Sequence, residues 1–187
     1  LKVYNVPVLY FPKFFHPDPT VKRQSGFLIP SFNNSTVLGS SINIPYYHVI
    51  SQNQDFTFRQ TLFDDDVKMF QNEYRIKNKN SSLFLDFAYI NNFKSTLTNK
   101  KNSISHIFAN FDADLAWKNF TQSDLLVSIK KVSNDTYLKI FDGNIYKNEV
   151  SPTNYDVLKS EAKLILNNEN YNFTTGFQSY EDLNLSN

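Results

Sequence analysis

Two aspartates two residues apart are the first feature of the sequence that could do chemistry. On an extended strand Asp112 and Asp114 would point to the same face, and a pair of carboxylates can carry out acid–base glycoside hydrolysis. The same alternation places Asn110 on that face, and Lys118 follows shortly after. This mixture of polar side chains is typical of a surface that meets water. We therefore predict that Asn110, Asp112 and Asp114 line a water-filled lumen and do not act on a substrate.

The other residues that could bind a metal or take part in catalysis give weaker signals. The acidic run from Asp64 to Asp66 could attract a divalent cation, but it lacks the further oxygen ligands that calcium takes, so a solvated turn is favoured. His16, His48 and His106 are far apart and have no ligand spacing. The sequence has no cysteine, which excludes thiolate metal sites, a cysteine nucleophile and a disulfide within these residues. We predict no metal site, no cofactor and no enzymatic activity.

Composition narrows the class of protein. The net charge is +1, and the Lys and Arg residues are scattered among Asp and Glu, so no basic stripe could neutralise a row of phosphates and nucleic acid is not an expected partner. Aromatic residues make up 16% of a chain whose mean hydropathy is −0.43. No apolar run reaches the roughly 18 residues of a transmembrane helix. The chain begins at Leu1 without a methionine or a targeting segment, and we interpret it as an excerpt from a longer protein.

The clearest structural signal is alternation with a period of two. Residues 107 to 117 place apolar side chains on one parity and polar side chains on the other, and residues 83–89, 125–130 and 158–166 repeat the pattern. Strands of about ten residues exceed the usual five or six and match the roughly 9 to 11 with which a tilted strand crosses a bilayer. We therefore predict an all-β fold and an antiparallel transmembrane β-barrel. The alternation alone leaves a soluble β-sandwich open.

The connections between the expected strands differ in length. Most are short clusters of Asn, Asp, Ser and Lys, whereas residues 91–103 and 134–155 form longer links, both on the same side of the sheet when strands are counted alternately. Outer-membrane barrels have short periplasmic turns and long external loops, so this arrangement favours the barrel. Within the second long link we expect a short helical turn over residues 135–141, before Gly143.

The N-terminal region differs from the rest of the chain in composition. Its short apolar stretches are interrupted by Pro7, Pro12, Pro17, Pro19 and Pro30. Proline cannot donate a hydrogen bond to a strand ladder, so this region should be edge strand and connector. Four motifs occur here in a fixed order: VPVLYFP at residues 6–12, PDP at 17–19, RQSGFLIP at 23–30 and IPYY at 44–47. In order and spacing they resemble the junction region of the lipopolysaccharide-assembly protein LptD family, also called OstA or organic solvent tolerance protein.

The resemblance implies an architecture and a function. Residues 1–20 would be the last strand of a periplasmic β-jellyroll and a connector, and residues 21–187 would be about nine strands that form the N-terminal portion of a large outer-membrane β-barrel. The family transports lipopolysaccharide into the outer leaflet through a seam between the first and last strands. Implied partners are lipopolysaccharide, outer-membrane lipids, the plug lipoprotein LptE and the periplasmic bridge protein LptA. The implied location is the bacterial outer membrane, with the N-terminal residues in the periplasm.

The resemblance also assigns residues. Those matching the jellyroll–barrel junction are Pro7, Pro12, Pro17, Pro19, Ser25 and Gly26. Pro30 and Pro45 match the family's two gate prolines, and we expect both to fall inside strands. Each lacks a backbone N–H and forfeits a ladder hydrogen bond, so the first hairpin should pair less tightly beside the seam. The alternative is that these prolines mark bulges or strand ends.

Two other functions compete with lipid transport. One is a passive porin-like barrel, which would not need the proline-rich entry segment, and the other is a soluble β-sandwich that binds a ligand, for which the strands are too long. If the face that carries Ala113 meets lipid at mid-depth, Ala113→Arg should cost about 2–4 kcal/mol, whereas Asp112→Asn on the lumen face should be nearly neutral.

Overall fold

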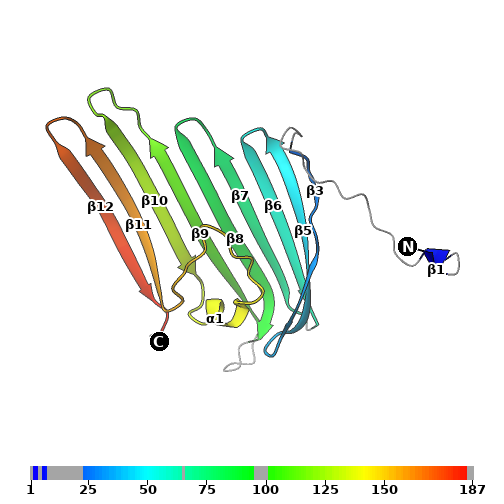
Figure 1. Cartoon of the computed structure of the whole chain (residues 1–187). Helices are drawn as coiled ribbons and strands as arrows, with labels where there is room; N and C mark the ends of the chain where they lie inside the picture. The colour runs from blue at the N-terminus through cyan, green and yellow to red at the C-terminus, as the bar shows by residue number, and fades with distance from the viewer. Residues whose placement is uncertain (1, 4–5, 8–22, 65, 95–100, 185–187) are drawn as a thin grey trace.

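The computed structural model describes residues 2–3, 6–7, 23–64, 66–94 and 101–184, and most of these lie in antiparallel strands (Figure 1). β1 (Lys2–Val3) and β2 (Val6–Pro7) form a separate two-stranded pair. The main sheet contains β3 (Gly26–Phe27), β4 (Ser31–Ser35), β5 (Gly39–Ser51), β6 (Gln54–Phe63), β7 (Lys68–Lys77), β8 (Ser81–Lys94), β9 (Lys101–Asp114), β10 (Gln122–Val132), β11 (Val157–Asn167) and β12 (Asn172–Asp182). The all-β prediction is confirmed.

From β5 onward, each strand of the main sheet pairs with its neighbours in sequence. β3 and β4 both pair with β5, whose other side pairs with β6, so together they form one interrupted edge strand. The sheet has ten strands, and if β3 and β4 are counted as one strand it has nine. The opposite edge is β12, which pairs only with β11 among the described residues.

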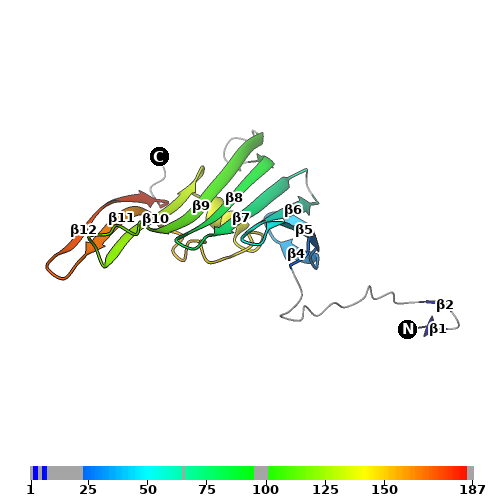
Figure 2. The same ribbon diagram turned by 90° about the horizontal axis from the view of Figure 1, so that it is seen from above.

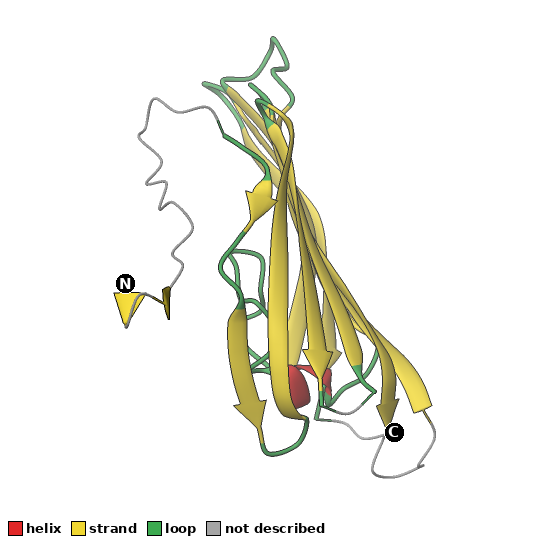
Figure 3. Cartoon of the chain, turned by 90° about the vertical axis from the view of Figure 1, so that its right-hand side faces the viewer, coloured by secondary structure: helices red, strands yellow, loops and turns green. Residues whose placement is uncertain are grey.

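The two faces of the sheet have different surroundings. Residues 133–156, the β10–β11 connection, fold back over one face, which we call the loop face; Figure 2 shows the connection along one side of the sheet. The connection contains the only helix of the described residues, α1 (Tyr137–Phe141), which lies beside the strands in Figure 3 and confirms the expected helical turn. That helix is too short to cross a membrane.

A buried apolar cluster lies between the connection and the loop face. Its residues that are at most 2% exposed are Met69, Ala88, Ile90, Phe108, Tyr137, Leu138, Phe141, Val150 and Leu158. The strand residues of this cluster share the loop face with polar neighbours, and the alternation is clearest in β6, where every second side chain, from Asp55 to Phe63, is buried. The expected period of two is therefore present in the structure.

The opposite, outer face carries exposed apolar side chains. In the middle of the sheet these include Phe87, Tyr89, Ile107 and Ile129. Among the described residues no second sheet packs against either face of this one, because the strands outside it form only the β1–β2 pair. The arrangement is that of one long-stranded sheet and does not favour a β-sandwich.

One predicted link is shorter than expected. β8 continues to Lys94 and β9 begins at Lys101, so residues 91–94 and 101–103 belong to strands and not to a loop. The Asn91–Asn92 pair resembles a turn signal, but Asn92 adopts φ +63° in a ladder irregularity between Ile90 and Phe93. Asparagine tolerates this left-handed conformation, which allows a bulge without ending the strand.

Candidate functional site

The edge strand is interrupted at the two prolines. β3 pairs with Tyr46 and Tyr47, and β4 pairs with residues 39–43, so residues 28–30 lie opposite only Ile44 and Pro45. The backbone N–H of Leu28 donates to the carbonyl oxygen of Pro45 at 2.9 Å. In an antiparallel ladder such a pair normally exchanges two hydrogen bonds, but Pro45 has no N–H to return. The missing bond therefore falls between the edge strand and β5.

The expectation that both prolines lie inside strands is right for one and wrong for the other. Pro45 is a buried residue of β5, whereas Pro30 lies between β3 and β4. Pro30 has no N–H, and it also restricts the backbone of Ile29 before it, so pairing stops there and resumes at Ser31. Beside this break Ile29 and Phe32 are 86% and 80% exposed.

Buried polar side chains cross the middle of the loop face. Arg59 of β6 and Glu73 of β7 form an ion pair at 3.0 Å, and both side chains are more than nine-tenths buried. From the connection, Asn148 Nδ2 donates to Glu73 Oε1 at 2.9 Å and to Asp86 Oδ2 at 2.7 Å. The Arg59 guanidinium also stacks on the Tyr146 ring, 3.6 Å from its centroid. These contacts fix the connection to the sheet.

His106 belongs to this structural network. Its ring lies between Asp86 Oδ1, at 3.2 Å from Nε2, and the Tyr137 hydroxyl, at 2.5 Å from Nδ1. Burial and, secondarily, the nearby Asp86 carboxylate raise the pKa of Tyr137 well above its usual 10.0. Side chains of both His106 and Asp86 are fully buried, so they attach the connection and cannot meet a substrate from solvent.

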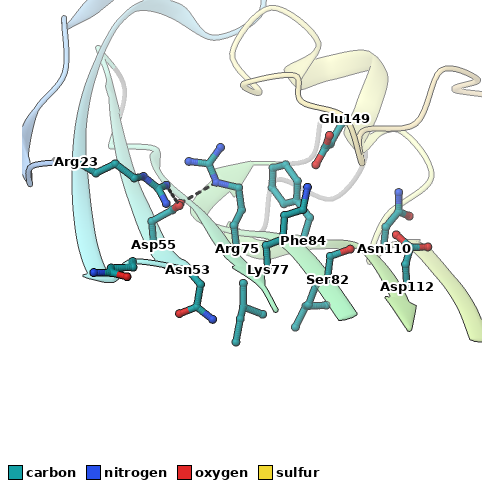
Figure 4. A pocket seen from close by; sticks show the side chains of 13 residues that line it. Arg23, Asn53, Asp55, Arg75, Lys77, Ser82, Phe84, Asn110, Asp112 and Glu149 are labelled. Carbon is teal, nitrogen blue, oxygen red and sulfur yellow. Dashed lines mark hydrogen bonds and ion pairs between the residues drawn. The ribbon is translucent and has the colours of Figure 1, made fainter. Parts of the chain in front are cut away.

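The structure places the predicted lumen residues on the loop face. Asn110 and Asp112 line a cavity of about 640 Å³ together with Arg75 and Glu149, as Figure 4 shows. Arg75 Nε donates to Asp55 at 2.7 Å on the far side of this cavity. Arg23 also forms an ion pair with Asp55.

Asp114, the last residue of β9, accepts a hydrogen bond from the backbone N–H of Ala116 at 2.9 Å. It therefore stabilises the end of the strand. The apolar alternation continues to Trp117 in the sequence, but Ala116 adopts φ +50° and the chain turns away.

The remaining predicted residues are spread along the chain. Ser25 Oγ accepts a hydrogen bond from the Val49 N–H at 2.8 Å, and Gly26 begins β3. Asp64 Oδ2 accepts one from the Ser40 N–H at 2.7 Å. Pro7 ends β2. The residues that lie outside the described part of the chain are Pro12, Pro17, Pro19, His16 and Asp65. Within the described residues, no group of three or more His, Asp or Glu side chains could hold a metal ion.

Some residues of the site were not predicted from the sequence. The loop-face side chains Asp55, Arg59 and Glu73 belong to strands whose polar alternation was visible, because Asp55 to Thr61 places a polar residue at every second position. The partners Tyr146 and Asn148, however, are 75 residues from the residues to which they hydrogen-bond in β7, and no local pattern indicates them.

Several curated proteins that are similar to this chain are named LPS-assembly protein LptD. The chain is 28% identical to the LPS-assembly protein LptD of Idiomarina loihiensis over 96% of its own length, and 24% identical to that of Pseudomonas fluorescens over its whole length. A stretch of 58 residues is 45% identical to LptD of Shewanella frigidimarina. Along nearly its whole length this chain is similar to part of LptD. The predicted resemblance is confirmed.

The match covers only part of each relative. The chain spans 22% of the Idiomarina LptD, 19% of the Pseudomonas protein and, through the 58-residue stretch, 7% of the Shewanella protein. No protein-family model matches the sequence. The similarity to LptD therefore rests on alignments that run along nearly the whole of this chain.

Proposed function

We propose that this chain forms the first strands of an outer-membrane β-barrel that inserts lipopolysaccharide into the outer leaflet through a seam at the β3–β4 edge. The observation that carries the proposal is the interrupted ladder at Pro30 and Pro45, which lies at the open edge of the sheet. The names of the LptD relatives supply the substrate class. Further strands would pair with the two open edges, since a bilayer tolerates no unpaired edge.

The two faces of the sheet support a barrel wall. Exposed apolar side chains on the outer face, such as Phe87 and Ile107, suit contact with acyl chains. The loop face, with Asn110 and Asp112 beside a cavity, suits a lumen that passes the sugar portion of the lipid. In this orientation the connection lies at the external end of the barrel.

The finer assignments of the family are part of the same proposal. Residues 1–20 would belong to the periplasmic jellyroll and its connector, with Pro7, Pro12, Pro17, Pro19, Ser25 and Gly26 at the junction. The bridge protein LptA would deliver lipopolysaccharide from the periplasm, and the lipoprotein LptE would plug the lumen. The mechanism moves a lipid and needs no covalent step.

The free energy of the missing ladder hydrogen bonds is large enough to make the seam easier to open. One absent ladder bond is worth about 0.5–1.5 kcal/mol net in water, and an unpaired carbonyl in lipid costs several kcal/mol. Because Pro45 cannot donate to the edge strand and Pro30 cannot donate at all, the edge strand is held less tightly than a regular strand would be.

The test restores the missing donors. In the full-length protein in its own bacterium, the double variant Pro30→Val and Pro45→Val should tighten the edge and slow the arrival of newly made lipopolysaccharide at the cell surface, measured by pulse labelling. Barrel assembly, measured by heat-modifiable mobility, should be unchanged. Pro152→Ala in the connection is the matched control, because it restores a donor away from the edge. Wild-type export by an assembled double variant would refute the gate.

A further inference from the structure

The β10–β11 connection reaches the edge strand across the whole intervening sheet. It leaves the sheet after Val132 of β10, and its residues Gly143 and Asn144 contact β4 and β5. The hydrogen bond between Asn33 and Gly143 joins positions 110 residues apart in sequence. The connection thus links the centre of the sheet to the edge at which we propose the seam.

The part of the connection that lies over the centre of the sheet is firmly attached. Tyr137, Leu138 and Phe141 are at most 2% exposed and belong to the apolar cluster. Tyr137 also contacts His106, and Asn148 bonds to buried carboxylates of β7 and β8. Detaching this part would expose several fully buried side chains, so it is the more stable part of the connection.

The tip of the connection is attached by hydrogen bonds. Asn33 Nδ2 donates to the carbonyl oxygen of Gly143 at 2.9 Å, and Asn144 Nδ2 donates to Ser41 Oγ at 2.9 Å. Asn33 and Ser41 are direct cross-strand partners in the β4–β5 hairpin. Two consecutive residues of the tip therefore hold both arms of the hairpin that contains the edge strand.

Gly143 and Asn144 bring no apolar side chain to this contact, although Leu38 of the β4–β5 turn belongs to the same buried cluster as Phe141. A cavity of about 270 Å³ separates the tip from the proline break, and its lining includes Ile29, Ser31, Pro45 and Asn144. The Asn33–Gly143 bond is exposed to solvent. Water can replace the exposed bond at small cost and the partly buried Asn144–Ser41 bond at a greater one, so these two bonds set how readily the tip detaches while the rest of the connection stays in place.

We infer that Gly143 and Asn144 form a latch that holds the edge strand in its closed position and must release Asn33 and Ser41 before the seam opens. The inference rests on the proposed function. It assigns to Asn33, Ser41, Gly143 and Asn144 a positioning role that is separate from the loss of ladder bonds at the prolines. The break at Pro30 supplies the joint about which the released β4 segment moves.

A disulfide tests whether release is required. A Cβ built on Gly143 lies 3.1 Å from Asn33 Nδ2, which is two bonds beyond the Asn33 Cβ, so a disulfide between the two positions needs at most a small shift of the exposed tip. Gly143 has no positive φ, so cysteine is tolerated there, and the chain has no cysteine of its own. In the full-length protein, oxidised Asn33→Cys/Gly143→Cys should lose lipopolysaccharide export, and a reductant should restore it. Each single cysteine variant, and the wild type with reductant, are the controls.

Weakening the latch should have the opposite effect. Asn33→Ala with Asn144→Ala should keep export but admit large antibiotics that the closed barrel excludes, whereas Asn34→Ala on the exposed neighbour should not. Wild-type export by the oxidised cysteine pair, or an unchanged antibiotic barrier in the alanine pair, would overturn the latch. Export that does not fall when the protein is depleted would overturn the proposed function itself, so the two failures are distinct.

Discussion

Arginine at Phe87 distinguishes a lipid-facing sheet from a water-facing one. Phe87 lies in the middle of β8, on the outer face, with Asn72 and Ile107 as its cross-strand partners. Its side chain is 37% exposed, so an arginine can extend outward without forcing its neighbours apart. In water such a surface change is worth within about 0.5 kcal/mol, but at the midplane of a bilayer arginine costs about 2–4 kcal/mol.

The measurement is a urea titration of the full-length protein folded into phospholipid vesicles. Phe87→Gln corrects for the loss of the ring, and the excess cost of Phe87→Arg over Phe87→Gln reports the charge in lipid. Ala113→Arg is the depth control: Ala113 is the next-to-last residue of β9, not the mid-depth position that the sequence suggested, so its cost should be only about 0–1 kcal/mol. Equal stability of Phe87→Arg and Phe87→Gln would refute the membrane orientation of this face.

Two further predictions concern the attachment of the connection. Glu73→Gln leaves the buried Arg59 without its counter-charge and should cost about 3–5 kcal/mol in the same titration, whereas Glu169→Gln in an exposed turn should cost nothing measurable. Because burial and Asp86 raise the folded-state pKa of Tyr137, the stabilisation from its neutral hydroxyl is complete below pH 10.0 and declines above it. The wild-type urea midpoint should therefore fall more steeply above pH 10.0 than that of Tyr137→Phe, and parallel pH profiles would count against this role.

The strands and their faces could be predicted because alternation is a local property of the sequence. Ile107 and Phe111 on one parity, and Asn110 and Asp112 on the other, lie on opposite faces of β9 as expected. Strand ends were less accurate, because Asn92 forms a bulge where a loop was expected. The acidic pair Asp112 and Asp114 was correctly placed at one face, but the structure gives Asp114 a role at the end of the strand.

The contacts of the connection could not be predicted from the sequence. Asn144 resembles any other loop asparagine, and its partner Ser41 is 103 residues away. The prolines were found through the family resemblance, yet the break between β3 and β4 depends on how Pro30 and Pro45 meet across the ladder. Sequence spacing alone does not give that register.

The separation between Asn33 and Gly143 also constrains the order in which the protein assembles. Neighbouring strands of this sheet are mostly neighbours in sequence, so hairpins can form early and nearly independently. The latch spans 110 residues and cannot close until β10 and the connection have been made. The edge strand therefore stays unlatched while the strands from β5 to β10 are made.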